Sequence, residues 1–399
     1  MTPPFHRFAA GGLLALACVG AQAQTLAAGD RHALAVQSDG TVLAWGDNRQ
    51  GQLGQGVTLG STTARTIAIP GTVTSVRALG KRAMALDSQG NVWTWGNNSL
   101  GALGDGGLEA ERADPRVVMR NATFISGSTD SSLAVDSQGK VWSWGVSMSP
   151  RVAAEFPVRI AKAYYESGSI MAIDEAGGVW GWGYGGPCVF QDPAPFTNKT
   201  TPFKIEGLPP VQDLWVTGGG YWDHGYIPAR AVAVTALDRD GNAWSWGGKS
   251  AGDCQPRKTN AMPTGGGSHF ITSAGAVLSQ YRYDGSPQAG IYSPPLLSNL
   301  PPVQRLSLGG TRAYALTRTG ELWEWPLASE TQADDGSGRL IRKIASGVSD
   351  MAGFAAGLPA PGIFYITSDG KLNAIGPNTD LLLGIPREVE SRSSPVKVP

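Results

Sequence analysis

Histidine is the side chain most often used for proton transfer and metal binding near neutral pH, and this sequence carries few of them. Beyond the N-terminal segment there are only His32, His224 and His269, and none lies in an H-E-x-x-H motif or beside Cys at metal-binding spacing. The sequence also has no phosphate-binding G-x-x-x-x-G-K-[ST] loop. We therefore predict no catalytic residues, no metal and no cofactor, although dispersed side chains could still converge in the fold.

The cysteines indicate a structural kind of chemistry. Cys188 follows Trp182 by six residues and Cys254 follows Trp246 by eight, so the two occupy corresponding loops of consecutive repeats, described below. An oxidising compartment would join them, whereas a reducing one would leave two free, buried thiols. We predict a Cys188–Cys254 disulfide between neighbouring units.

An aromatic loop, TGGGYWDHGYIPAR at 217–230, is the strongest candidate for binding a partner. It is an insertion of about ten residues relative to the other repeats. Its candidate contact residues are Tyr221, Trp222, Asp223, His224 and Tyr226. Aromatic loop residues offer a large contact area with polar ends, which suits protein recognition. The rings could instead fold back as a plug or cover an apolar edge, so both interpretations stay open.

The N-terminus has the parts of a secretory signal in the correct order. Arg7 supplies the positive charge, residues 8–20 are apolar but too short to span a bilayer, and Ala21-Gln22-Ala23 offers a cleavage site. We predict that residues 1–23 are a leader and that the protein is exported to the periplasm or the medium. The alternatives are a buried first element and, ranked lower, a lipid anchor at Cys18.

Repeats organise the rest of the chain, residues 24–399. Seven segments share an apolar strand, a tight turn ending in Gly, and a second strand that ends in Trp-Gly or a degenerate form of it. The first reads HALAVQSDGTVLAWG and the second RAMALDSQGNVWTWG. Because Gly accepts the positive φ that tight hairpins require, each segment is predicted to be a β-hairpin and the protein all-β.

A large ring marks the same place in six of the repeats. These repeat marks are Trp45, Trp95, Trp144, Trp182, Trp246 and Trp325. In five repeats a second Trp stands two residues earlier, on the same face of the strand. A residue repeated in every unit indicates architecture, here the packing of one sheet on the next, rather than a ladder of ligand sites.

The combined pattern resembles the regulator of chromosome condensation repeat. The first unit carries Gly29, His32, Leu34, Asp39-Gly40, Trp45-Gly46, Asn48, Gly51, Leu53 and Gly54. The second carries Gly96, Asn98, Gly101, Leu103 and Gly104. The resemblance implies a seven-bladed β-propeller of four-stranded blades. His32 has no counterpart in the other repeats, where Ala83 and Ala313 stand at the aligned position. We therefore interpret His32 as a local hydrogen-bonding residue.

Two features bear on the number and closure of the blades. The long step from Trp246 to Trp325 leaves an eighth blade possible, with its turn at Asp284-Gly285, although we favour seven blades and an insertion. The ending SSPVKVP resembles segments that precede hairpins elsewhere, and the start TLAAGDRHALAV resembles the residues that come directly after such segments. We therefore predict that the N- and C-terminal segments pair within one blade and so close the ring.

Net charge limits the partners. The formal charge is zero, so no basic face is expected for nucleic acid. No segment after the leader predicts a membrane span. The leading hypothesis is a monomeric, exported binding scaffold for an unidentified protein partner, inhibitor-like as one exported bacterial type of this family is. The alternatives are guanine-nucleotide exchange on a small GTPase, as in the nuclear family member, and a hydrolytic or carbohydrate-binding propeller.

Overall fold

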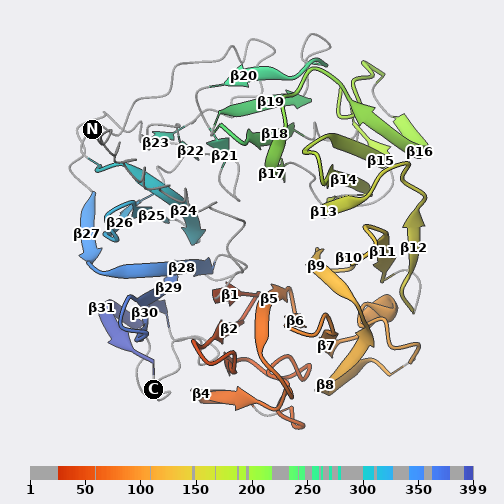
Figure 1. The fold of residues 1–399 in the computed structure, drawn as a ribbon. Helices are drawn as coiled ribbons and strands as arrows, with labels where there is room; N and C mark the ends of the chain where they lie inside the picture. The colour runs from red at the N-terminus through yellow and green to blue at the C-terminus, as the bar shows by residue number, and fades with distance from the viewer. Residues whose placement is uncertain are drawn as a thin grey trace, which may run out of the picture.

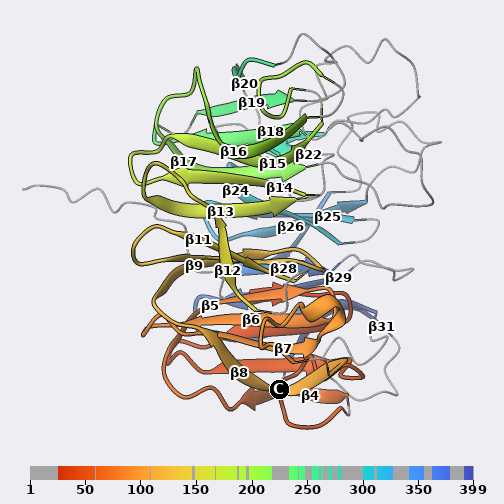
Figure 2. The same ribbon diagram turned by 90° about the vertical axis from the view of Figure 1, so that its right-hand side faces the viewer.

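Consecutive antiparallel sheets, each made of strands that follow one another in the sequence, are arranged around a centre (Figure 1). The computed structural model describes residues 26–398 apart from 59, 108, 146–148, 167, 187, 195–196, 218–232, 241, 248–253, 260–261, 264–268, 272–276, 280–299, 310–311, 327–340, 355–361 and 378–390. Seen from the side, the strands run between the two ends of the ring (Figure 2). The protein is an all-β propeller, as predicted.

Seven of the sheets have four strands in sequence order. The first contains β1 (Leu26–Ala28), β2 (His32–Val36), β3 (Val42–Gly46) and β4 (Ser61–Ile67). The second contains β5 (Val73–Leu79), β6 (Arg82–Asp87), β7 (Val92–Asn97) and β8 (Glu111–Met119), with a 3-10 turn, η1 (Ser99–Gly101), after β7. The third contains β9 (Ala122–Gly127), β10 (Ser132–Asp136), β11 (Val141–Trp144) and β12 (Arg151–Ala154). The fourth contains β13 (Ile160–Glu166), β14 (Ser169–Asp174), β15 (Val179–Gly185) and β16 (Thr197–Ile205).

The remaining four-stranded sheets follow the same plan. The fifth contains β17 (Val211–Thr217), β18 (Ala233–Asp238), β19 (Ala243–Gly247) and β20 (Arg257–Thr259). After the long step come β24 (Val303–Gly309), β25 (Arg312–Thr317), β26 (Leu322–Pro326) and β27 (Arg342–Ala345). The last sheet contains β28 (Val348–Phe354), β29 (Gly362–Thr367), β30 (Leu372–Pro377) and β31 (Ser391–Lys397). These seven sheets agree with the seven predicted blades.

A smaller sheet occupies the long step. Its described residues form three strands, β21 (Met262–Pro263), β22 (His269–Ile271) and β23 (Val277–Ser279), which contact β18 on one side and β24 on the other. Its place in the ring is that of the eighth blade left open from the sequence. The turn proposed for that blade, Asp284-Gly285, lies outside the described residues.

The turn glycines explain how one sheet is fixed to the next. Gly139 has φ +77°, as the hairpin requires, and an added Cβ would lie only 2.7 Å from the Cα of Arg159, the residue directly before the following sheet. Its carbonyl accepts the N–H of Ile160, the first residue of the next inner strand, at 3.0 Å. The same link joins Gly40 to Val73, Gly90 to Ala122, Gly177 to Val211 and Gly320 to Val348. Glycine is therefore required at this position for two reasons: it accepts the positive φ of the hairpin, and it has no side chain to collide with the next sheet.

The repeated Trp rings pack between sheets, as the pattern indicated. Trp45, Trp95, Trp144, Trp246 and Trp325 are all at most 4% exposed. Trp95 lies among Leu34, Val42 and Ile67 of the preceding sheet. Trp182 is the exception, because it is only half-buried and its Nε1 donates to the carbonyl of Thr200.

The prediction that the termini share one blade is wrong. β1 pairs with β2 in the first sheet, and β31 pairs with β30 in the last. Segments like SSPVKVP are the outer strands of the sheets before them, as ERADPRVVM is in β8, and a repeating pattern does not say which neighbour they join. The ring closes by face-to-face packing instead: Trp45 and Leu26 share a core cluster with Phe364, Ala374 and Val398.

Candidate binding face

The two ends of the ring differ in the connections they carry. In an antiparallel sheet of sequential strands, the connection from first to second strand and that from third to fourth lie at the same end. Contacts between sheets align these ends around the ring: the Asp30 N–H, between β1 and β2, donates to the Gly80 carbonyl, between β5 and β6. We call this end the disulfide face. The opposite end, with the hairpin glycines, is the turn face.

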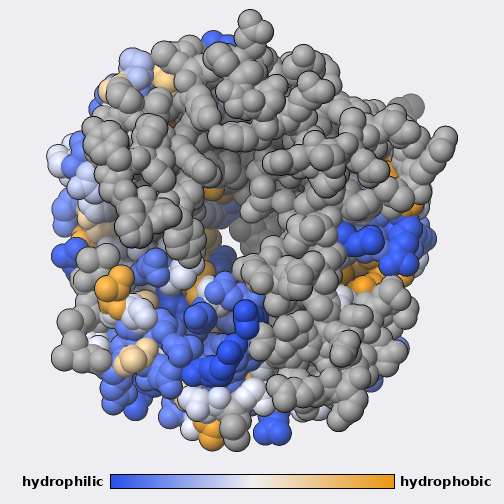
Figure 3. Space-filling model, turned by 180° about the vertical axis from the view of Figure 1, so that it is seen from behind, coloured by the Kyte–Doolittle hydropathy of each residue, from blue (hydrophilic) through white to orange (hydrophobic). Residues whose placement is uncertain are grey.

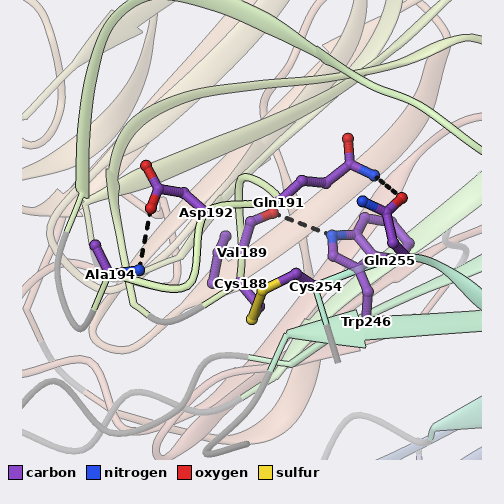
Figure 4. Close-up of a disulfide and its surroundings, with 8 residues drawn as sticks. All are labelled: Cys188, Val189, Gln191, Asp192, Ala194, Trp246, Cys254 and Gln255. Carbon is purple, nitrogen blue, oxygen red and sulfur yellow. Dashed lines mark hydrogen bonds between the residues drawn. A yellow bond between two sulfur atoms is a disulfide. The ribbon is translucent and has the colours of Figure 1, made fainter. Parts of the chain in front are cut away.

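The predicted disulfide is present on this face (Figure 4). Cys188 follows β15 and Cys254 precedes β20, and their Cα atoms are 4.2 Å apart. The bond therefore ties the third-to-fourth-strand connections of neighbouring sheets, as their positions in the repeats indicated.

Other contacts make the same junction rigid. Trp246 Nε1 donates to the Val189 carbonyl at 3.0 Å, and Gln191 Nε2 donates to Gln255 Oε1 at 3.0 Å (Figure 4). Phe190 is buried, and it occupies the space that a side chain at Gly181 would need. The Cys188 loop is thus anchored in the core between two sheets, which fixes the position of the surface that this loop forms.

Exposed apolar side chains gather on the disulfide face. Among the described residues the large hydrophobic side chains that are exposed are Val57 at 49%, Leu100 at 69%, Val158 at 39% and Tyr184 at 50%. Val57, Leu100 and Tyr184 lie in or beside third-to-fourth-strand connections, whereas Val158 lies on the turn face, between β12 and β13. Leu100 has φ +60°, a strained value for a residue with a side chain, and it presents its side chain to solvent.

The aromatic loop itself, with Tyr221, Trp222, Asp223, His224 and Tyr226, lies outside the described residues. The strand ends that it joins are described: β17 ends at Thr217 and β18 begins at Ala233. This is a first-to-second-strand connection, so both ends belong to the disulfide face.

Residues 24–52 and 39–82 match two models of the regulator of chromosome condensation (RCC1) repeat. The fold is similar to that of Prp20p from Saccharomyces cerevisiae, with a TM-score of 0.58 and 18% identity over 94% of this chain and 86% of that one. Residues 24–82 therefore carry the regulator of chromosome condensation repeat, and the chain as a whole has the fold of these propellers.

Two further solved structures show the same fold. Yeast RCC1 (Prp20), solved bound to Kap60, has a TM-score of 0.56 at 16% identity over 100% of this chain and 91% of that one. Human WBSCR16 has a TM-score of 0.52 at 19% identity over 82% of this chain and 84% of that one. No curated protein matches the sequence.

The strand register corrects the alignment of the first two repeats, in which Ala83 was matched to His32. His32 pairs with Gly46 and Arg82 pairs with Gly96, so Arg82, not Ala83, is the counterpart of His32. Both side chains are buried on the disulfide face. His32 is not the hydrogen-bonding residue we expected, because neither ring nitrogen has a partner among the described residues.

Arg82 does the bonding that was expected of His32. Its guanidinium donates to the carbonyls of Ser128, Thr129 and Ser131 in the next sheet, at 2.7 to 2.9 Å. Burial lowers its pKa to about 10, so it stays charged at neutral pH. Arg82 therefore clamps the β9–β10 connection to the second sheet.

A repeated Asp was missed in the sequence. The first Trp of four pairs donates from Nε1 to an Asp six residues earlier, at 2.8 to 3.0 Å: Trp93 to Asp87, Trp142 to Asp136, Trp180 to Asp174 and Trp244 to Asp238. The same carboxylates accept backbone N–H groups of the hairpin turn, as Asp87 does from Gln89 and Asn91. The sequence does contain the pattern that predicts this bond, because an Asp recurs six residues before the first Trp of each of these pairs. Its role is to hold the turn.

The structure offers little for catalysis in its described part. A pocket of about 350 Å³ on the turn face is lined by residues that include Asp136 and Trp142, but Asp136 already accepts from Trp142, Gln138 and Lys140. The described residues hold no group of three or more His, Cys, Asp and Glu that could bind a metal. Nor do they include a helix long and apolar enough to cross a membrane.

Proposed function

We propose that this chain is an exported, monomeric β-propeller that binds a protein partner through its disulfide face. The observation that carries the proposal is the placement of Val57, Leu100 and Tyr184, three of the four exposed large hydrophobic residues in the described part, on that face. Exposed apolar side chains on firm loops are typical of protein-binding surfaces. The aromatic loop between Thr217 and Ala233 would extend the same surface.

Export is supported by the disulfide and by the leader-like segment 1–23. A disulfide between two loops persists in an oxidising compartment and is rare in the cytosol. Prp20p is a precedent for protein binding on this fold, since its structure was described with its binding to Gsp1p and histones. Nucleotide exchange is not proposed here, because the likeness to that protein is one of fold.

Site-specific photocrosslinking in the native host tests the surface. A photoreactive residue at Leu100 or Tyr184 should give a discrete crosslinked protein, and the same residue at Val158 on the turn face is the matched control. Crosslinking from Val158 alone, or equally from all three positions, would contradict the proposed face. N-terminal sequencing of the protein recovered from periplasm or medium tests the leader, with Gln24 expected first.

A further inference from the structure

The connections from one sheet to the next differ in length on the turn face. Those from β4 to β5, β12 to β13 and β16 to β17 are residues 68–72, 155–159 and 206–210, five residues each. The connection from β8 to β9 is only Arg120 and Asn121. Less chain therefore covers the junction of the second and third sheets than covers those three junctions.

Each five-residue connection places an apolar side chain against the same core cluster as the first Trp of the next sheet. These pairs are Ile69 with Trp93, Phe156 with Trp180, and Leu208 with Trp244. Arg120 and Asn121 supply no such side chain. Trp142 is the corresponding ring of the third sheet, and it is in none of the core clusters formed by the described residues.

The pocket of about 350 Å³ on the turn face lies at this junction. Its lining consists of residues from the end of the second sheet and from the first hairpin of the third, namely Met119, Arg120, Asn121, Asp136, Ser137, Gln138 and Trp142. None of them belongs to the inner strands β5 and β9, so the pocket is separate from the hollow at the centre of the ring that Figure 3 shows from behind. Its volume is near the lower end of the range for small-molecule sites.

Polar side chains surround the Trp142 ring in this pocket. Asn121, Ser137 and Gln138 are exposed, and their side chains have no hydrogen-bond partner among the described residues. Arg120 makes one hydrogen bond within the described part of the chain, from Nη1 to Asn91 Oδ1 at 3.0 Å, and a guanidinium carries five N–H donors. The pocket thus offers both hydrogen-bond donors and acceptors beside one aromatic ring.

Hydrogen bonds hold the walls of the pocket in place. The Ser137 N–H donates to the Asn121 carbonyl at 2.7 Å, which joins the turn of the third sheet to the connection. Trp142 Nε1 donates to Asp136 Oδ2 at 2.8 Å, which fixes the ring. Arg120 and Asp136 are the charged residues of the lining, and their formal charges cancel. The pocket is therefore preformed and suits a neutral ligand.

We propose that this pocket binds a neutral sugar unit. One face of the pyranose ring packs on Trp142 and Met119, and its hydroxyl groups bond to Arg120, Asn121 and Gln138. A pyranose has a face of C–H groups that is complementary to an indole ring, and its hydroxyl groups both donate and accept hydrogen bonds. The site is at the opposite end of the ring from the disulfide face, so it does not depend on the proposed protein partner.

Saturation-transfer difference NMR tests the site, with residues 24–399 and D-glucose, D-galactose or N-acetyl-D-glucosamine, each alone. The wild type should give a signal with at least one sugar, strongest on the C–H protons of one ring face. Trp142→Ala should raise the Kd for that sugar at least about threefold. Trp93→Ala is the matched control and should bind like the wild type, because Trp93 makes the same bond to Asp87 at a junction with a longer connection.

Two further variants guard against misfolding. Asn121 has φ +61°, so Asn121→Gly removes the amide and keeps the backbone conformation; it should weaken sugar binding and leave Tm near that of the wild type. Arg120→Leu replaces the guanidinium with an apolar side chain for the Trp142 ring, and it should abolish the signal in a folded protein. A wild type that binds none of the three sugars, variants that bind as well as the wild type, or equal losses in Trp93→Ala and Trp142→Ala would overturn the proposal.

Discussion

A buried, neutral imidazole makes the stability of this protein depend on pH. His32 is fully buried, and burial lowers its pKa to about 4, against a smaller raising effect of Asp47. In the unfolded chain the same ring titrates near its usual value of about 6.5. Between about pH 6.5 and 4, the unfolded state therefore binds a proton at His32 that the folded state does not bind.

The sign of the effect follows from this difference. Above about pH 6.5 neither state binds the proton and the stability is complete. Between about 6.5 and 4 the unfolded state gains it first, so the free energy of unfolding should fall by about 3 kcal/mol over this window. Urea denaturation from pH 7.5 to 4 should show this fall in the wild type and a flatter curve in His32→Leu. Parallel curves for the two proteins would contradict it.

Two of the hairpin glycines separate the cost of a side chain at positive φ from the cost of a clash with the next sheet. Gly139→Ala introduces a strained φ and a clash with Arg159, directly before the next sheet, whereas Gly370 has nearly the same φ, +80°, and nothing within 4 Å of an added Cβ. We expect Gly370→Ala to cost about 1 to 2 kcal/mol of unfolding free energy and Gly139→Ala at least about 1 kcal/mol more. Equal losses in urea denaturation would mean that the contact between sheets is unimportant.

At the scale of the elements, Arg82 holds one connection to its neighbour. Arg82→Met should lower the free energy of unfolding by about 3 kcal/mol or more, because three carbonyls of the β9–β10 connection lose a charged donor. Hydrogen exchange followed by mass spectrometry should show the change concentrated in residues 128–131. Unchanged exchange there, with an unchanged denaturation midpoint, would refute the clamp.

The disulfide reinforces a junction that also has non-covalent contacts. A closed loop of this size, with its cysteines 66 residues apart, stabilises a protein by up to about 4 kcal/mol. We expect Cys188→Ser/Cys254→Ser to lose roughly 2 to 4 kcal/mol and to keep its circular dichroism spectrum, since the Trp246–Val189 and Gln191–Gln255 hydrogen bonds remain. Loss of the native spectrum at 25 °C would show that the loops depend on the covalent bond.

Much of this architecture was readable from the sequence because the repeat specifies local structure. The turn glycines, the Trp marks and the spacing of Cys188 and Cys254 predicted the hairpins, the packing between sheets and the cross-link. The sheet to which an outer strand belongs was not readable, because SSPVKVP looks the same whichever neighbour it joins. The contact between Tyr164 of β13 and Asp213 of β17 could not be predicted either, because only the packing of the sheets around the ring brings these residues together.

At the scale of the molecule, the seam between the first and last sheets is the place where the ring closes. Trp45 and Phe364 meet edge to face, with ring centroids 5.1 Å apart, in a core shared by both sheets. Phe364→Ala should lower the free energy of unfolding by about 3 to 5 kcal/mol and speed hydrogen exchange in β1 and β2.

Truncation from Ser393 onward provides the comparison for this seam. It removes much of an outer strand that pairs with β30, together with Val398 of the shared core, so faster exchange is expected first in β30 and to a smaller extent in β1 and β2. If the truncation instead exposed β1 and β2 more than Phe364→Ala did, the seam would depend on the terminal strand and not on the packed rings.

Because every sheet is encoded by one uninterrupted stretch of chain, the ring has a simple route to change its size in evolution. An in-frame duplication or deletion of one such stretch adds or removes a whole unit, and no strand needs a new partner in a distant part of the gene. The unit that contains β21–β23, in the long step between two four-stranded sheets, is an additional unit of this kind. Related genes should therefore differ in length by whole units more readily than propellers whose two ends must share a sheet.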